Sequence, residues 1–142
     1  MRTAVDTNVC SILWAGLERA PFAARMLDSA QQAGSLTISP IVFSEMLASP
    51  FVTESFVLQY LKDSDIAVDF GLSDRVWLEA GRRFREYGVR RRQSGGGDPK
   101  RTLADFVVGA HALVQADRLL TFDAGRYAVD FPELRLADTR AL

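Results

Sequence analysis

Short apolar segments of strand length alternate with longer segments of helical pattern along most of this chain. This alternation is typical of a parallel β-sheet with helices on both faces. Strands are predicted at residues 2–5, 35–39, 66–70, 118–123 and 134–138. We therefore expect an α/β fold, a three-layer α/β/α sandwich around a central, mostly parallel five-stranded sheet, built as a single domain over residues 1–142.

The segments between these strands carry helix signals. Pro21 marks a helix start and Gly34 lies just past its end, while Ser39 and Pro40 form an N-cap and first-turn pair. Helices are predicted at residues 9–17, 21–33, 40–49, 53–63, 74–88 and 103–116. Residues 88–101 are predicted to be a basic, glycine-rich loop.

Several classes of protein are disfavoured by composition. No apolar run approaches the ~20 residues of a membrane span, and the N-terminus has no signal-peptide pattern. The single cysteine, Cys10, favours a reducing cytoplasm. With one cysteine and one histidine the chain lacks the usual zinc ligands. A metal site would therefore use oxygen ligands, which points to Mg²⁺ or Mn²⁺.

Four acidic residues lie next to apolar segments: Asp6, Glu45, Asp105 and Asp123. Asp6 directly follows one predicted strand and Asp123 ends another, and ligands bind at the carboxyl ends of strands in open α/β sheets. Two like charges ~4 Å apart repel by about 4 kcal/mol at an effective dielectric of ~20. A divalent cation would turn that repulsion into a binding site.

Each acid also has a structural interpretation to weigh. Asp6 and Asp123 suit turns after strands, and Asp105 follows Thr102 at the spacing of a helix capping box. Glu45 is harder to explain, because it shares a predicted helix face with apolar residues. The four acids together favour a shared cation site.

Positive charge is concentrated in one segment, although the net charge is only −1. Residues 82–101 hold eight of the 17 basic residues, which suits binding to a polyanion. A solvated helix end with a flexible loop is the structural alternative. The candidate nucleic-acid contacts are Arg90, Arg91, Arg92, Lys100 and Arg101. A carboxylate-held metal beside a basic arm indicates a nuclease.

Four motifs in this order resemble the PIN-domain family and, within it, the VapC-type toxins of toxin–antitoxin pairs. They are VDTNV with Asp6, FSEML with Glu45, LADFVVGAHAL with Asp105, and LLTFDAGRY with Thr121, Asp123 and Tyr127. The family commonly has a basic residue after the last acid. Here Ala124 stands in that place, with Arg126 two residues later.

The resemblance implies a Mg²⁺- or Mn²⁺-dependent endoribonuclease that acts on RNA. Asp6 and Asp105 would be the principal metal ligands, Glu45 would bind the metal directly or through water, and Asp123 would complete the pocket. Asn8 and Thr121 would orient these carboxylates. The resemblance further implies a homodimer inhibited by a cognate antitoxin.

Other functions stay open at this point. A housekeeping RNA-processing nuclease of the same fold would carry the same acids. A catalytically inactive PIN-like module would bind only RNA or a protein partner, and the four intact acids argue against it. A phosphatase that forms an aspartyl-phosphate would require an acid at the position of Asn8. His111, on an apolar helix, is interpreted as a satisfied or half-buried histidine.

Overall fold

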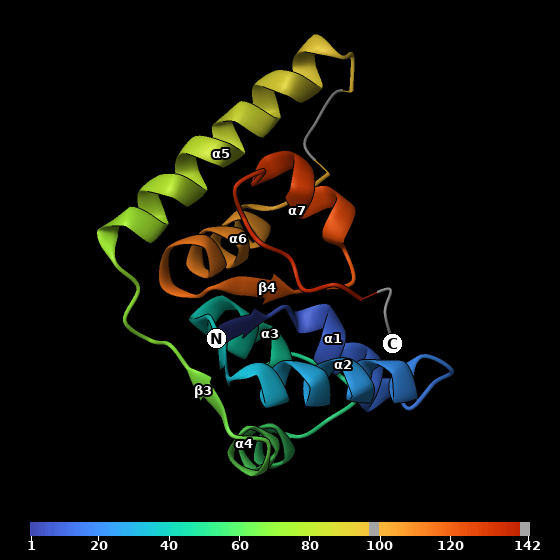
Figure 1. The fold of residues 1–142 in the computed structure, drawn as a ribbon. Coiled ribbons are helices and arrows are strands. Elements are labelled where there is room, and N and C mark those ends of the chain that lie inside the picture. The colour runs from blue at the N-terminus through green and yellow to red at the C-terminus, as the bar shows by residue number, and fades with distance from the viewer. Residues whose placement is uncertain (97–99, 140–142) are drawn as a thin grey trace.

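The computed structural model describes residues 1–96 and 100–139. Its strands are β1 (Arg2–Val5), β2 (Ser35–Ile38), β3 (Ile66–Val68) and β4 (Arg118–Leu120). Its helices are α1 (Thr7–Ala15), α2 (Ala20–Ala33), α3 (Pro40–Leu47), α4 (Glu54–Asp63), α5 (Asp74–Gln93), α6 (Leu103–Gln115) and α7 (Ala124–Asp130). The predicted α/β architecture is confirmed, with strands and helices alternating along most of the chain (Figure 1).

The central sheet is parallel throughout, with strand order β3-β2-β1-β4. The prediction of a fifth strand at residues 134–138 is wrong. That segment makes one parallel bridge, between Leu136 and Leu119. The backbone N–H of Leu134 is bonded to the carbonyl of Phe131 at 3.0 Å, so the segment begins as a turn and is extended only briefly beside β4.

The strand order explains how the helices are distributed. Connections between parallel strands are right-handed. The chain moves in one direction from β1 to β3 and then crosses to the opposite edge, so α5 and α6 belong on the other face from α2 and α4. Figure 1 shows this arrangement, with α6 between α5 and the sheet.

The crossing creates a switch point between β1 and β4, where the strand order reverses. Open parallel sheets bind ligands in the crevice outside the carboxyl ends of strands at such a point. Asp6 follows β1 directly, and its backbone N–H bonds to the Leu120 carbonyl of β4 at 2.9 Å. Asp123 lies three residues beyond the end of β4. The topology thus brings these two acids to one edge of the sheet.

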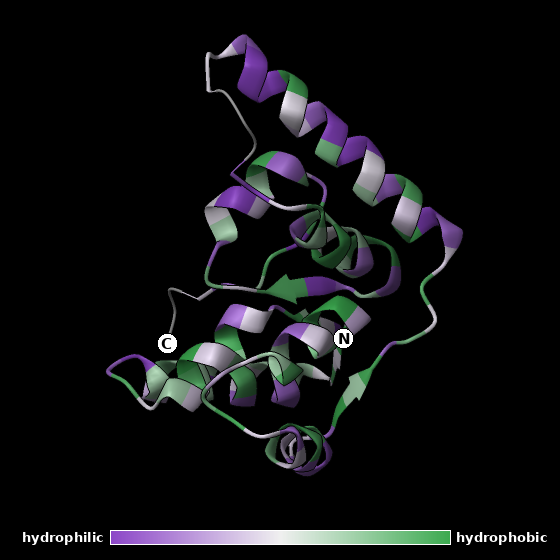
Figure 2. Cartoon of the chain, turned by 180° about the vertical axis from the view of Figure 1, so that it is seen from behind, coloured by the Kyte–Doolittle hydropathy of each residue, from purple (hydrophilic) through white to green (hydrophobic). Residues whose placement is uncertain are grey.

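Helix α5 is longer than predicted. It continues through Gly88 to Gln93, so Arg90, Arg91 and Arg92 lie in its last turn and not in a loop. Arginine is a good helix former and suits the negative end of the helix dipole. Gly95, at φ 73°, follows the helix end with a conformation that glycine adopts without strain. Figure 2 shows α5 as largely hydrophilic, above all towards its C-terminal end.

Helix α7 was not predicted, because DAGRY after β4 has the composition of a turn. It is anchored by aromatic packing: Tyr127 and Phe131 are both buried, and Phe131 lies against Gly109 of α6. A Cβ added to Gly109 would come within 2.4 Å of the Phe131 ring, so this close approach requires glycine. Over residues 1–96 and 100–139, no helix is both long and apolar enough to cross a membrane.

Candidate active site

Asp6 is the buried centre of the site, with 9% of its surface exposed. It caps α1, and its Oδ1 accepts a hydrogen bond from the Thr7 backbone N–H at 2.8 Å. Its Oδ2 accepts hydrogen bonds from the Thr121 hydroxyl at 2.8 Å and the Tyr127 hydroxyl at 3.3 Å. The carboxylate is therefore fixed from the start of α1, from the segment after β4 and from α7.

Burial raises the pKa of Asp6 from 3.8 to about 6. The hydrogen bonds from Thr121, Thr7 and Tyr127 lower this pKa, and the nearby charge of Glu45 raises it further. None of these interactions comes from a cationic group. A divalent cation beside Asp6 would favour its ionised form.

Glu45 is joined to Asp6 through one residue, Thr7. The Glu45 Oε1 accepts a hydrogen bond from the Thr7 hydroxyl at 2.8 Å, while the Thr7 backbone N–H donates to Asp6. Glu45 is exposed on α3 and not held among apolar side chains. The burial argument that singled it out in the sequence is therefore wrong, since Asp6 is the only buried member of the four acids.

Asp123 is joined to the same centre through Asn8 and Thr121. The Asn8 side-chain amide lies 3.5 Å from Asp123 Oδ2 and 3.4 Å from the Thr121 hydroxyl, and its carbonyl accepts from the Phe122 backbone N–H. The Thr121 hydroxyl also accepts from the Asp123 backbone N–H at 3.0 Å. Asn8 and Thr121 thus restrain the segment that carries Asp123.

Asp105 caps its own helix. Its Oδ2 accepts from the Thr102 backbone N–H at 3.0 Å while the Thr102 side chain accepts from the Asp105 backbone N–H, which forms a capping box. The same oxygen also accepts from the Thr102 hydroxyl at 3.3 Å. Arg101 Nε lies 3.9 Å from the same oxygen. Asp105 is also near Tyr127. The pKa of Tyr127 is raised by burial and by the charges of Asp6 and Asp105, so its hydroxyl stays protonated and donates to Asp6.

Hydrogen-bonded links join Asp6 to Glu45 through Thr7 and to Asp123 through Thr121, whereas the Asp105 carboxylate is bonded to Thr102 in its own helix cap. In the described part of the chain, no three His, Cys, Asp or Glu side chains are grouped so that they could hold a metal ion. The donor chemistry nevertheless fits a hard cation, because every candidate ligand is a carboxylate. Cys10 is buried in the core, and His111 is buried against Asp69 at 3.1 Å.

A buried ion pair lies behind the site and was missed in the sequence. Asp130 of α7 is 7% exposed and forms ion pairs with Arg101 and, at 2.5 Å, with Arg90. Arg101 is 6% exposed, and its guanidinium lies 4.9 Å from the ring centres of Phe106 and Tyr127. Arg101, predicted to contact RNA, is therefore placed to fix α7 against the start of α6, while Arg90 links α7 to α5. The spacing of Tyr127, Asp130 and Phe131 on one helical face could have indicated this.

The other predicted nucleic-acid contacts lie nearer the surface. Arg92 and Lys100 are exposed, and Arg90 is 44% exposed on its side chain while paired with Asp130. Arg91 donates a hydrogen bond to the Gly96 carbonyl. These residues gather at the C-terminal end of α5 and beside it.

The model of the PIN domain matches residues 3–132, and the chain therefore belongs to the PIN domain family. PIN domains are generally nucleases. No curated protein matches the chain in sequence. The predicted family is confirmed, whereas the ligand and RNA-contact roles of individual residues stay predictions.

Solved structures with the same fold include a toxin–antitoxin complex from Klebsiella pneumoniae, with a chain 17% identical and a TM-score of 0.61 over 99% of both chains. VapBC2 from Rickettsia felis, bound to a DNA fragment from its promoter, contains a chain 18% identical, with a TM-score of 0.65 over 96% of this chain and 98% of that chain. VapBC-1 from nontypeable Haemophilus influenzae gives 18% identity and a TM-score of 0.65 over 98% of both chains. FitAcB from Neisseria gonorrhoeae gives 17% identity and a TM-score of 0.62 over 99% of both chains. These likenesses show a shared fold.

Proposed function

We propose that this PIN domain is a metal-dependent endoribonuclease and the toxin of a toxin–antitoxin pair. One observation carries the proposal. The buried Asp6 lies at the switch point of a parallel sheet, and short hydrogen-bonded links join it to Glu45 through Thr7 and to Asp123 through Thr121. A buried carboxylate linked to further carboxylates supports cation-assisted hydrolysis better than a purely structural role.

The proposed cation is Mg²⁺ or Mn²⁺, held by Asp6 and Asp105 as principal ligands together with Glu45 and Asp123. When bound, it supplies Lewis-acid activation of water and neutralises charge at the phosphodiester. Thr121 and Tyr127 hold the Asp6 carboxylate in place by hydrogen bonds.

The proposed substrate is RNA. The exposed basic side chains at the C-terminal end of α5 supply the positive charge that binding to a phosphate backbone requires. Arg92 and Lys100 are exposed on this side of the molecule and are the simplest candidates for phosphate contacts.

The proposed partner is a small antitoxin that covers the site, and the toxin–antitoxin complex from Klebsiella pneumoniae, which shares this fold, supports it. A second copy of the chain is the proposed dimer partner, and the cytoplasm is the proposed location. Co-purification of the chain with the product of a small neighbouring gene, and loss of cleavage in that complex, would support the antitoxin. Sedimentation of the isolated chain tests the dimer.

Metal dependence is the direct test of the activity. We expect the chain to cut single-stranded RNA in Mg²⁺ or Mn²⁺, to stop in excess EDTA and to recover when the metal is restored. Sequencing of the RNA ends identifies the bond that is cut. Full cleavage in EDTA by the purified chain would contradict the proposal.

A further inference from the structure

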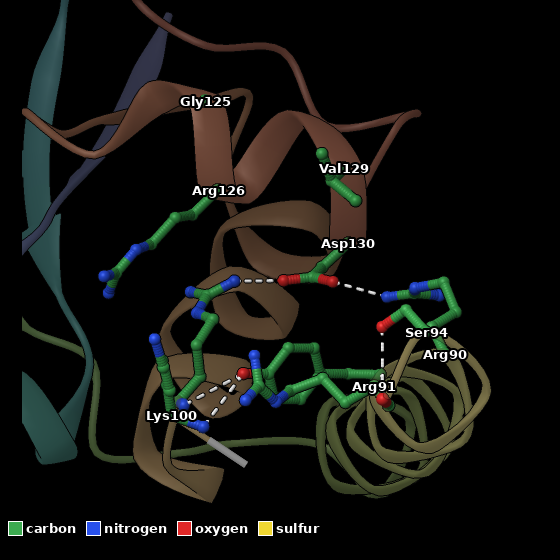
Figure 3. A pocket seen from close by; sticks show the side chains of 10 residues that line it. Arg90, Arg91, Ser94, Lys100, Gly125, Arg126, Val129 and Asp130 are labelled. Carbon is green, nitrogen blue, oxygen red and sulfur yellow. Dashed lines mark hydrogen bonds and ion pairs between the residues drawn. The ribbon is translucent and has the colours of Figure 1, made fainter. Parts of the chain in front are cut away.

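A hollow of about 500 Å³ lies between the C-terminal end of α5, the segment before α6, and α7 (Figure 3). Its lining is strongly unequal in charge. Five basic side chains face one carboxylate: Arg90, Arg91, Lys100, Arg101 and Arg126 against Asp130. Such an excess favours an anionic ligand.

The single carboxylate does not compete for that ligand. Asp130 is buried and is engaged from two sides by Arg101 and Arg90, as Figure 3 shows for the Arg90 contact. Lys100 and Arg126, by contrast, are exposed at the hollow and come from different elements. Their charges are therefore available to a ligand from solution.

The size and walls of the hollow indicate the class of ligand. Its volume is within the range of ~300–1,000 Å³ that is common for small-molecule sites. The hollow is therefore larger than a bare phosphate ion would fill. Val129, 66% exposed, and Gly125 give it an apolar wall on α7. Ammonium and guanidinium groups bind phosphate, and an apolar wall suits a ribose or base. An acidic peptide would satisfy the charges but leave this wall uncovered.

The hollow adjoins the carboxylate site. Arg101 lines it and lies over the ring of Tyr127, whose hydroxyl donates to Asp6. Arg126 lies in the first turn of α7, and its backbone N–H bonds to the Asp123 carbonyl at 3.0 Å. An RNA strand seated in the hollow would thus continue towards Asp6 and Asp123.

We propose that this hollow binds one nucleotide of single-stranded RNA beside the bond that is cut, with Lys100 and Arg126 on its phosphate. This inference rests on the proposed ribonuclease function and adds a defined substrate pocket to it. Arg126 then supplies the positive charge that Ala124 does not provide after the last acid.

The test measures binding of a fluorescently labelled single-stranded RNA to the full chain in EDTA, where no cleavage is expected. We expect the Lys100→Ala/Arg126→Ala variant to bind about tenfold or more weakly at low salt and to reduce the slope of log affinity against log salt by about 1–2. Arg75→Ala is the matched control, because Arg75 is exposed at the opposite end of α5. It should change the affinity less than twofold.

Competition identifies the ligand class. Adenosine 5′-monophosphate should displace the labelled RNA from the wild-type chain, and adenosine should not. Displacement by polyglutamate as effective as by the nucleotide would overturn the nucleotide assignment in favour of an acidic peptide. RNA affinity unchanged in the double variant would overturn the pocket.

Cleavage in Mg²⁺ or Mn²⁺ separates the pocket from the proposed activity. If the wild-type chain cuts RNA and the double variant binds and cuts equally well, the pocket is wrong and the nuclease stands. If the wild-type chain cuts nothing but the double variant loses RNA binding, the nuclease is wrong and the pocket stands.

Discussion

The hydroxyl of Tyr127 donates a hydrogen bond to Oδ2 of Asp6 at 3.3 Å, across 121 residues of sequence. This bond ties α7 to the carboxyl end of β1. It also helps to keep the Asp6 carboxyl ionised, because it lowers a pKa that burial raises. Helix α7 therefore positions the Asp6 carboxylate through Tyr127 and does not merely lie beside the site.

The effect of removing the Tyr127 hydroxyl on stability and on the pKa of Asp6 should be measurable in a variant that keeps the fold. We expect Tyr127→Phe to lower the free energy of unfolding by about 1 kcal/mol, the usual net value of one hydrogen bond, and to raise the pKa of Asp6 further. Urea denaturation measures the first effect, and NMR titration of the Asp6 carboxyl measures the second. An unchanged Asp6 pKa would show that the bond does not form in solution.

The pH dependence of stability in EDTA should report on Asp6. Its folded-state pKa of about 6 lies above the unfolded value of 3.8. Between pH 3.8 and 6, Asp6 is therefore mostly protonated in the folded chain and mostly ionised in the unfolded chain. The contribution of Asp6 to stability should therefore fall as pH rises from 4 to 6, by about 3 kcal/mol at 1.36 kcal/mol per pKa unit, and then level off. Chemical denaturation at each pH measures it. Asp6→Asn should remove this contribution, and an identical pH profile in the variant would contradict the assignment.

The ion pair between Asp130 and Arg101 should be costly to break. Asp130→Asn leaves the buried Arg101 without its counter-charge, and we expect a loss of about 3–5 kcal/mol in unfolding free energy. Glu133→Gln is the control, since Glu133 pairs with Arg83 at the surface and should cost less than about 1 kcal/mol. Equal losses in the two variants would show that burial of the pair is not the cause.

The close packing of the Phe131 ring against Gly109 of α6 can be tested by adding one methyl group at residue 109. Gly109→Ala would place its Cβ within 2.4 Å of the Phe131 ring and should destabilise the fold by about 1–3 kcal/mol. Gly81→Ala makes the same change on α5, where no neighbouring atom lies within 4 Å. It should stabilise by about 0.5–1 kcal/mol. Thermal unfolding distinguishes the two, and an equal shift in both would contradict the packing described for Phe131.

The strands and most helices were predictable because their signals are local. Buried apolar runs mark β1, β2 and β4, and Ser39 with Pro40 marks the start of α3. The end of α5 was not predictable in this way. Gly88 suggested a stop, but the arginine run after it continues the helix and is held by Asp130, which is 40 residues away in sequence.

The candidate site was only partly predictable for a similar reason. Strand ends identify Asp6 and Asp123, because topology alone brings them together. The burial of each acid depends on packing that the sequence does not display, so Glu45 was wrongly expected among apolar neighbours. The basic neighbours of Arg101 in the sequence indicate a nucleic-acid contact, yet two aromatic rings and Asp130 enclose its side chain.

The most direct test of the account compares RNA cleavage by the wild-type chain, Asp6→Asn and Asp28→Asn in Mg²⁺ or Mn²⁺. Asp28 is an exposed acid on α2 and serves as the matched control. If Asp6 is the centre of a cation-assisted nuclease site, Asp6→Asn should lose roughly 100-fold or more of the rate, while Asp28→Asn should cut like the wild type. Equal cleavage by all three proteins would contradict the central claim.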